Sequence, residues 1–203
     1  MAGAQPSVPY DGSACASIVE NWTRGPIEGF TSEPFWDLFV EYRYDAPVAG
    51  EAGFEIGNYR PIDRSLQFVA SRHVVIDGPP EGVKIVSFPY RQPKISSRDF
   101  SQHYSQVHGP LVAKSAAFKT ILRRYVQYHV VTDSVRRYPQ DTKPFDAIAV
   151  FWITSVDDAI NAWRDPEYLG TLKPDRDRII SESHRVVVDE RIVWPKASIA
   201  DRR

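Results

Sequence analysis

The hydrophobic pattern divides the chain into a carboxy-terminal part with clear periodicity and an amino-terminal part with a weaker pattern. The division falls at residues 77–82 (DGPPEG), a cluster of Pro and Gly that is typical of a turn or linker. Beyond it, four short runs rich in β-branched and aromatic residues each predict a strand. These runs are residues 83–90 (VKIVSFPY), 121–132 (ILRRYVQYHVVT), 146–153 (DAIAVFWI) and 183–193 (SHRVVVDERIV).

Between the first two of these strands, apolar residues recur at helical spacing. Ser96 and Ser97 can each cap a helix, and Asp99 favours its first turn. One helical face, directed at the core, then carries Phe100, Tyr104, Val107, His108 and Leu111. The pair Gly109-Pro110 is expected to break or kink this helix.

A second helix is predicted between the third and fourth strands, where Ser155 followed by Asp158 is typical of a capping box. Residues 156–163 then repeat apolar side chains at helical spacing. The predicted order is therefore strand–helix–strand–strand–helix–strand, the ferredoxin-like arrangement of an α+β fold. We expect one such unit at residues 83–195, followed by a tail at residues 196–203.

The first 80 residues predict two further strands, at 35–44 and 68–76, separated by stretches with weak periodicity. The chain also resembles itself at an offset of 112 residues, the distance from Asp63 to Asp175. At this offset the pattern Asp-Arg…Ser…Val-Val…Asp of residues 63–77 recurs at residues 175–189. We interpret residues 1–80 as a degenerate half of a second ferredoxin-like unit, or an extension. Two strands of similar composition can also look alike by chance.

Composition and charge narrow the class of protein. The 203 residues include 25 basic and 26 acidic side chains, so the chain lacks the cationic surplus typical of nucleic-acid-binding proteins. No run approaches the ~20 apolar residues of a membrane-spanning helix, and the amino terminus shows no basic start followed by an apolar stretch. Cys15, the single cysteine, excludes an intrachain disulfide. These features predict a cytoplasmic protein with neither a nucleic acid nor a membrane as partner.

Two motifs in the carboxy-terminal part resemble the EthD-like family of the dimeric α+β barrel superfamily. Residues 108–111 (HGPL) are similar to the family's His–small–Pro–Leu turn, and residues 125–129 (YVQYH) are similar to its Tyr-Val-Gln-x-His strand. The resemblance covers about residues 83–195. It implies a barrel formed by the sheets of two protomers, with a small-molecule pocket between the sheet and the helices of each one. Relatives and barrel cousins include dehydratases, decarboxylases, cyclases, cofactor-free monooxygenases and haem enzymes, so the fold alone does not fix the chemistry.

The two motifs supply the strongest candidates for catalysis. His108 lies on the apolar stripe one turn after Tyr104, so its imidazole should point towards the sheet and can move a proton near neutral pH. Strand alternation places Tyr125, Gln127 and His129 on one face of their strand. A core histidine bonded to backbone and a polar interface are the structural alternatives for these two groups.

The remaining histidines favour no metal or cofactor site. His103 is expected to be exposed, and His73 and His184 to be structural. His103 and His108 are five residues apart, which differs from the i, i+4 spacing of two ligands on one helical face. No glycine-rich nucleotide motif occurs. We therefore predict neither metal nor cofactor, although a lone axial histidine leaves no sequence pattern and His184 or His129 stays open as a haem ligand.

The leading hypothesis is a cofactor-independent lyase that acts on a hydrophobic, aromatic or polyketide-like carbonyl compound. Dehydration, decarboxylation and aldol-type cyclisation all require a proton to move next to a stabilised enolate. The predicted catalytic groups are His108, His129 and Tyr125, and the predicted substrate-binding groups are Tyr104, Gln127, Phe88 and Trp152. The alternatives are a cofactor-free monooxygenase acting on a phenolic substrate, and a non-catalytic accessory protein that binds a small molecule.

A homodimer is also predicted. A single unit would leave one sheet face open, with apolar residues such as Val186 and Val188 on it. In barrel relatives a partner protomer covers that face. The amino-terminal part could instead provide the cover within one chain.

Overall fold

The computed structural model describes residues 15–25, 27, 37–44 and 65–195. Within residues 83–195 the elements follow the predicted order of strand, helix, strand, strand, helix and strand. The four strands are β5 (Val83–Arg91), β6 (Leu122–Val130), β8 (Ala147–Ile153) and β9 (Ile180–Pro195). The first helical region consists of α1 (Ser97–His103), the π-helical turn η1 (Tyr104–His108), α2 (Gly109–Lys114) and α3 (Ala116–Lys119). The second consists of α4 (Val156–Arg164), the π-helical turn η3 (Tyr168–Leu172) and α5 (Lys173–Ile179).

Seven strands form one antiparallel sheet in the order β2-β1-β9-β5-β8-β6-β4. The strands added outside residues 83–195 are β1 (Cys15–Gly25), β2 (Leu38–Tyr44) and β4 (Ala70–Ile76). Strand β9 is 16 residues long and joins the two parts of the sheet, because residues 180–188 pair with β5 and residues 187–195 pair with β1. A separate pair consists of β3 (Ser65–Gln67) and β7 (Arg136–Tyr138), and η2 (Thr132–Ser134) is a short 3₁₀ turn before β7.

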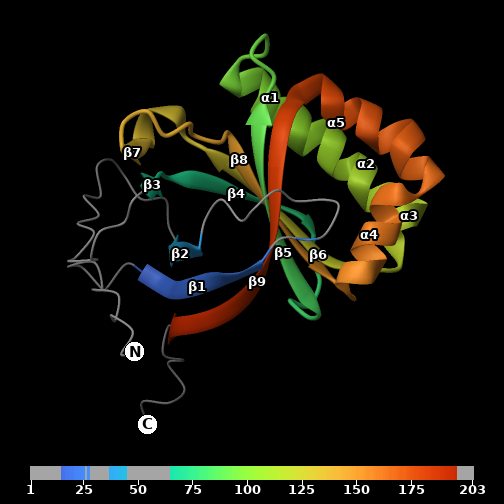
Figure 1. The fold of residues 1–203 in the computed structure, drawn as a ribbon, viewed down its shortest axis with the longest axis horizontal. Helices are drawn as coiled ribbons and strands as arrows, with labels where there is room; N and C mark the ends of the chain where they lie inside the picture. Colours follow the sequence, from blue (N-terminus) through green and yellow to red (C-terminus); the bar gives the residue numbers. More distant parts are fainter. Residues whose placement is uncertain (1–14, 26, 28–36, 45–64, 196–203) are drawn as a thin grey trace.

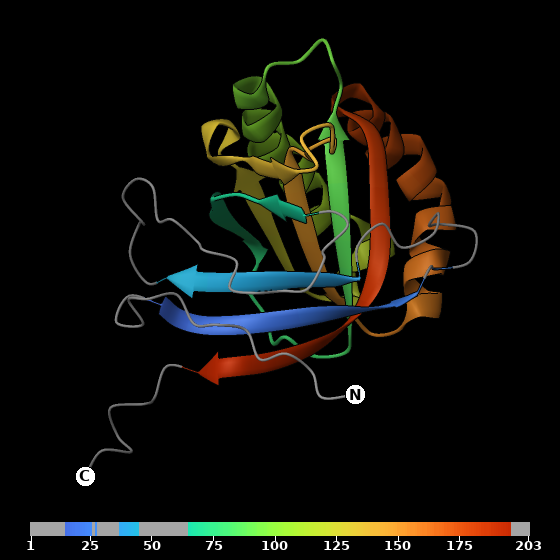
Figure 2. The ribbon, with the colours of Figure 1, turned by 60° about the vertical axis from the view of Figure 1, so that its left-hand side comes forward.

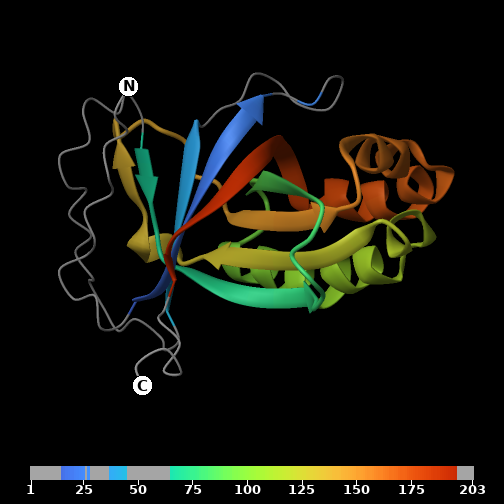
Figure 3. The same ribbon diagram turned by 90° about the horizontal axis from the view of Figure 1, so that it is seen from below.

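The sheet curls into a half-barrel with helices on one side (Figure 1). Figures 2 and 3 show β1, β2 and the end of β9 turned across the direction of β5, β6 and β8. The protein is therefore a mixed α/β protein with a curled antiparallel sheet, as expected for an α+β barrel. The first apolar core lies between the sheet and the helices, and it includes Phe100, Tyr125, Ile153, Trp163 and Leu172.

The opposite sheet face is covered within the same chain. Phe39 on β2, Leu66 on β3 and Phe68 pack against a second apolar core on that face. Val186 and Val188 belong to this core and are 2% and 5% exposed. The open face that motivated the homodimer is therefore closed in the chain itself, so the homodimer remains a prediction without that support.

The two strands predicted in the amino-terminal part are present as β2 and β4, while residues 35 and 36 lie outside the described residues. They occupy opposite ends of the seven-strand order. In the part of the chain that the structure describes, they do not form a second unit with their own sheet order. The internal repeat therefore stays a prediction.

An ion cluster links β2 to side chains of β5, β6 and β9. We use this name for Glu41 and Arg43 on β2, Lys84 on β5, Tyr128 on β6 and Glu190 on β9. The Lys84 ammonium donates to Glu41 at 3.0 Å and also contacts Glu190. Arg43 and Tyr128 donate to the other Glu41 oxygen at 2.9 and 3.0 Å. Burial alone would raise the pKa of Glu41, but the charges of Lys84 and Arg43 outweigh it and hold the pKa at about 2.

The first helix differs from the sequence expectation at Gly109-Pro110. The chain remains helical from residue 97 to residue 114, and η1 immediately precedes Gly109. The Gly109 amide donates to the Tyr104 carbonyl, a bond that spans five residues. Pro110 has no amide proton to donate to the preceding turn, and the wider π turn there accommodates it. The wider π turn lets the helix continue, so the predicted break is wrong.

Gly109 also brings this helix close to the sheet, and its substitution should be destabilising. A Cβ at this position would lie 3.1 Å from Val75 Cγ2 and 3.2 Å from Gln127 Nε2. We expect Gly109→Ala to lower the free energy of unfolding by about 1–2 kcal/mol, because overpacking outweighs the better helix propensity of Ala. At Gly170, on η3, an added Cβ meets no atom within 4 Å. Urea unfolding should show Gly170→Ala to be neutral or slightly stabilising, and an equal loss for both variants would contradict this account.

Candidate functional site

Three polar side chains from the two helical regions meet at the candidate site. His108 on η1 places Nδ1 2.9 Å from Asp175 Oδ2, and His103 on α1 places Nε2 2.8 Å from Asp175 Oδ1. Asp175 lies on α5 and is buried, as is His108. One carboxylate on the second helical region therefore binds two histidines of the first.

The π turn explains why both histidines reach the same carboxylate. In a regular α-helix, residues five apart point about 140° away from each other. The turn η1 closes a hydrogen bond across five residues and so brings such residues towards one face. The expectations that His103 is exposed and lies on another helical face than His108 are therefore wrong. His103 is only half-buried, but it shares Asp175 with His108.

The protonation of the trio follows from the state of Asp175. Burial alone would raise the pKa of Asp175, but the hydrogen bonds and charges of His108 and His103 outweigh it and hold the pKa below its ordinary value. An ionised carboxylate only accepts hydrogen bonds, so His108 Nδ1 must carry a proton. In neutral His108 the other ring nitrogen, Nε2, then has a free lone pair. Among the described residues no side chain binds this atom.

Strand β6 carries the predicted polar row. Tyr125, Gln127 and His129 all face the helices, while Val126 and Tyr128 pack in the second core on the other face. Gln127 Nε2 donates to the Tyr125 hydroxyl at 2.7 Å and to a backbone carbonyl of η1 at 3.0 Å. Gln127 Oε1 is buried and has no partner among the described residues. The strand alternation predicted from the sequence is thus confirmed.

Tyr104 connects the strand row to the histidine trio. Its ring stacks on His108 with a centroid distance of 5.3 Å, and it contacts His129 edge-on at 5.9 Å. Burial raises the pKa of Tyr104 to about 12 and raises that of Tyr125 well above its usual value, so both phenols are protonated at pH 7. The negative charge that the Tyr104 phenol would carry when ionised raises the pKa of Tyr125 further, because the two side chains lie near each other. Both hydroxyls can therefore act as hydrogen-bond donors.

His129 is held in its neutral form. Its Nδ1 lies 2.9 Å from the Ser101 hydroxyl, and its Nε2 is buried without a partner among the described residues. Burial, assisted by the charge of His73, lowers the pKa of His129 to about 4. At neutral pH this imidazole is uncharged, so the imidazolium form that acts as a general acid is scarcely populated.

The lowered pKa of His129 predicts a pH dependence of stability. Between pH 6.5 and 4 the unfolded chain binds a proton that the folded chain excludes, so the free energy of unfolding falls as the pH is lowered through this window. With allowance for solvent screening, we expect His129 to account for about 2 kcal/mol of this loss. Urea unfolding at pH 7 and pH 4.5 should show a smaller loss for His129→Gln than for the wild type. Equal losses would show that His129 titrates normally.

Two predicted substrate-binding residues lie elsewhere. Phe88 and Trp152 belong to the second core, on the sheet face away from the helices. Trp152 there lies under Lys84, whose ammonium is 4.9 Å from the ring centroid. They are separated from the histidine trio by the sheet, so their assignment to the same site is corrected.

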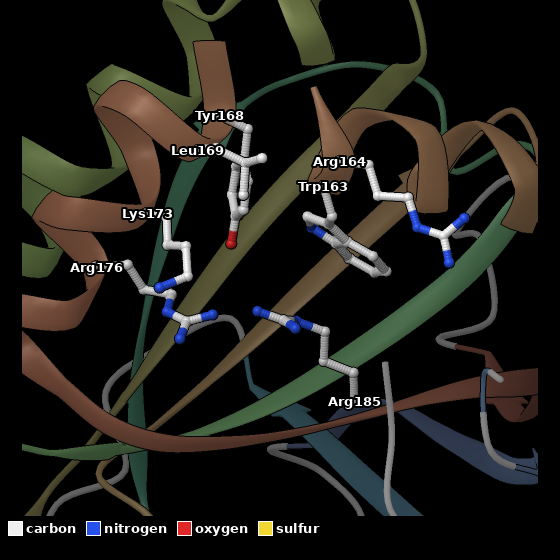
Figure 4. Close-up of a pocket in the computed structure, with 7 residues that line it drawn as sticks. All are labelled: Trp163, Arg164, Tyr168, Leu169, Lys173, Arg176 and Arg185. Atoms are coloured by element: carbon white, nitrogen blue, oxygen red, sulfur yellow. The ribbon is translucent and has the colours of Figure 1, made fainter. Parts of the chain in front are cut away.

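A hollow of about 280 Å³ opens between α4, η3, α5 and β9, and its lining residues include no member of the histidine trio. Figure 4 shows the cationic groups of Lys173, Arg176 and Arg185 converging with the Tyr168 hydroxyl, next to the ring of Trp163. None of these residues was predicted from the sequence to line a binding site. The segment 168–179 has no helical apolar periodicity to predict α5, and the residue pattern of β9 does not indicate that Arg185 faces a hollow.

Neither a metal cluster nor a membrane-spanning helix is present in the described residues. No group of three or more His, Cys, Asp or Glu side chains in them is arranged to hold a metal ion. None of their helices combines the length and apolar character needed to cross a membrane.

The fold and the site define an α+β protein with a half-barrel sheet and a polar site under its helices. Residues 92–183 match the model of the EthD domain family, which is the family that the two motifs predict. A search of the curated proteins found no match.

Among solved structures, the chain is similar to a "putative monooxygenase from Lactobacillus acidophilus NCFM". The two share 7% identity with a TM-score of 0.39, and the similarity covers 61% of this chain and 50% of that one. The chain therefore spans about half the length of that structure.

Proposed function

We propose that the protein is a cofactor-independent lyase in which His108, held by Asp175, removes a proton from carbon next to a carbonyl group. The observation that carries this proposal is the 2.9 Å contact of His108 Nδ1 with an ionised, buried carboxylate. Such a carboxylate fixes the tautomer and stabilises the imidazolium that forms. This arrangement turns Nε2 into an oriented general base.

The enolate that forms needs a donor for its oxygen, and Tyr104 fits this role. Its ring stacks on His108, and burial raises its pKa to about 12, so the hydroxyl keeps its proton at pH 7 and can donate it in a hydrogen bond. Gln127 supports the arrangement by donating to Tyr125. A neutral phenol in a buried site stabilises a developing oxyanion more strongly than water does.

Elimination of water illustrates the reaction and its proton balance. His108 takes the proton from the carbon, and the C–H electrons form the enolate. When the enolate collapses to the conjugated carbonyl, the bond to a β-hydroxyl breaks. The protonated His108 returns its proton to that leaving oxygen, which departs as water. His129, neutral and bonded to Ser101, has a positioning role at the edge of the site in this proposal, whereas the sequence predicted it as a catalytic group that complements His108.

The proposal also includes the fold of residues 83–195 and the role of the amino-terminal strands. We propose that residues 83–195 are a ferredoxin-like unit, supported by the order β9-β5-β8-β6 with every neighbour antiparallel. The amino-terminal hairpin takes the place that a partner's sheet has in a dimeric barrel.

The test is hydrogen–deuterium exchange, because it detects proton removal before the product is known. Aromatic β-hydroxy ketones are incubated with the enzyme in D₂O, and NMR follows loss of the signal next to the carbonyl. The wild type and His184→Gln, a histidine variant remote from the trio, should exchange the proton equally fast, and Asp175→Asn far more slowly. Absence of exchange above the buffer rate for the whole panel would refute the proposal. Oxygen consumption coupled to exchange would instead identify the monooxygenase alternative, which begins with the same proton transfer.

A further inference from the structure

The hollow between α4, η3, α5 and β9 has an excess of positive charge. Arg176 and Lys173 both bind the carboxylate of Asp177, at 3.0 and 2.6 Å. Arg185 forms no ion pair with any described carboxylate. Lys173 and Arg176 therefore share one acidic partner, while Arg185 and Arg164 add further positive charge to the lining of the hollow.

Arg185 is positioned rather than solvated. Its guanidinium lies over the Trp163 ring, 4.8 Å from the centroid, and approaches the Tyr168 hydroxyl. Trp163 and Tyr168 are themselves buried. A guanidinium held by aromatic rings keeps its paired N–H donors free, and these donors match the two oxygens of a carboxylate.

The shape of the hollow limits the rest of the ligand. Trp163 and Tyr168 supply aromatic side chains to its lining, and the volume of about 280 Å³ suits a compound of one or two rings. Burial raises the pKa of the Tyr104 phenol, and the positive charges of Arg185 and Arg176 lower it by a smaller amount.

We propose that this hollow binds an aromatic carboxylate, with Arg185 as the main anchor of the carboxylate and the aromatic side chains of Trp163 and Tyr168 as part of the wall around its ring. That the bound acid occupies the place of the substrate, so that the enzyme acts on aromatic keto or hydroxy acids, rests on the proposed function. The binding itself stands on the hollow alone.

Calorimetric titration with 1-naphthoate and its neutral counterpart 1-naphthamide tests the binding. The wild type should bind naphthoate at least tenfold more tightly than naphthamide, and added KCl should weaken only the naphthoate. Arg185→Gln should lose about tenfold in naphthoate affinity, and Arg185→Lys should fall between the two, because it keeps the charge but not the paired donors. Arg178 is an exposed arginine of α5 that does not line the hollow, so the Arg178→Gln variant should bind naphthoate as the wild type does.

Two results would overturn the binding proposal. The first is that the wild type binds naphthoate and naphthamide with equal affinity. The second is that the Arg185→Lys and Arg185→Gln variants both bind naphthoate as tightly as the wild type does. Separate measurements keep this proposal distinct from the lyase. Wild-type protein that binds naphthoate but exchanges no proton would refute only the reaction. Naphthoate should inhibit the exchange reaction at concentrations near its dissociation constant. Binding without inhibition would contradict the shared place of acid and substrate.

Discussion

His108→Ala is expected to lower the turnover of a substrate found by the exchange assay by ~10²–10⁴-fold, the usual range for loss of a positioned acid or base. The protein should remain folded, because Asp175 keeps its hydrogen bond to His103. Steady-state rates and circular dichroism measure the two effects. The substrate's KM should change little, since Nε2 acts on the reacting proton rather than on binding.

Asp175→Asn provides the sharper comparison. The amide can donate to His108 Nδ1, which favours the tautomer with its proton on Nε2 and removes the base. A fall in rate similar to that of His108→Ala, with no further fall in the double variant, is expected for two residues that act as one unit. If His108→Ala instead keeps its rate while its melting temperature falls sharply, His108 is a structural histidine of the core.

Lys84→Met is expected to lower the free energy of unfolding by ~3–5 kcal/mol, the range for breaking a buried ion pair. Lys84 and Glu41 are 4% and 6% exposed, and the variant leaves the Glu41 carboxylate with only Arg43 as a cationic partner in the ion cluster. Urea unfolding measures the loss. Arg24→Met, which breaks an ion pair between exposed residues of β1 and β9, should lose much less.

Adding Glu41→Leu to Lys84→Met distinguishes two causes of the lost stability: an unpaired buried charge and the loss of side-chain packing. If the loss comes from an unpaired buried charge, the double variant should recover a large part of it. A double variant that loses the sum of the two single losses would show that Lys84 acts mainly through its packing against Trp152.

The sequence predicted the parts of the fold that local rules determine. Four apolar runs became strands, and the Ser96 and Ser155 hydroxyls cap their helices as expected. Alternation along a single strand placed Tyr125 and Gln127 on the correct face, because the side-chain period is independent of the neighbouring strands.

The parts that failed depend on relations between elements. Which face of β5 and β8 carries Phe88 and Trp152 is set by the sheet register, and no local pattern reports it. Asp175 lies in a charged segment, residues 173–178 (KPDRDR), without apolar periodicity, so its helix and its meeting with His108 could not be predicted. The two π turns also shift the helical phase, which removes the basis of an analysis at 3.6 residues per turn.

The π turn at residues 104–108 makes the site depend on a residue count. A π turn corresponds to a single additional residue accommodated within an α-helix. In a regular α-helix the present spacing of five residues would point His103 about 140° away from His108, and so away from Asp175. Deleting one residue from the exposed pair Gln106 and Val107 would leave the two histidines four residues apart, a spacing at which a regular α-helix also keeps them on one face. The two-histidine arrangement therefore depends on the match between the residue count of this stretch and its helix geometry, and not on the three side chains alone.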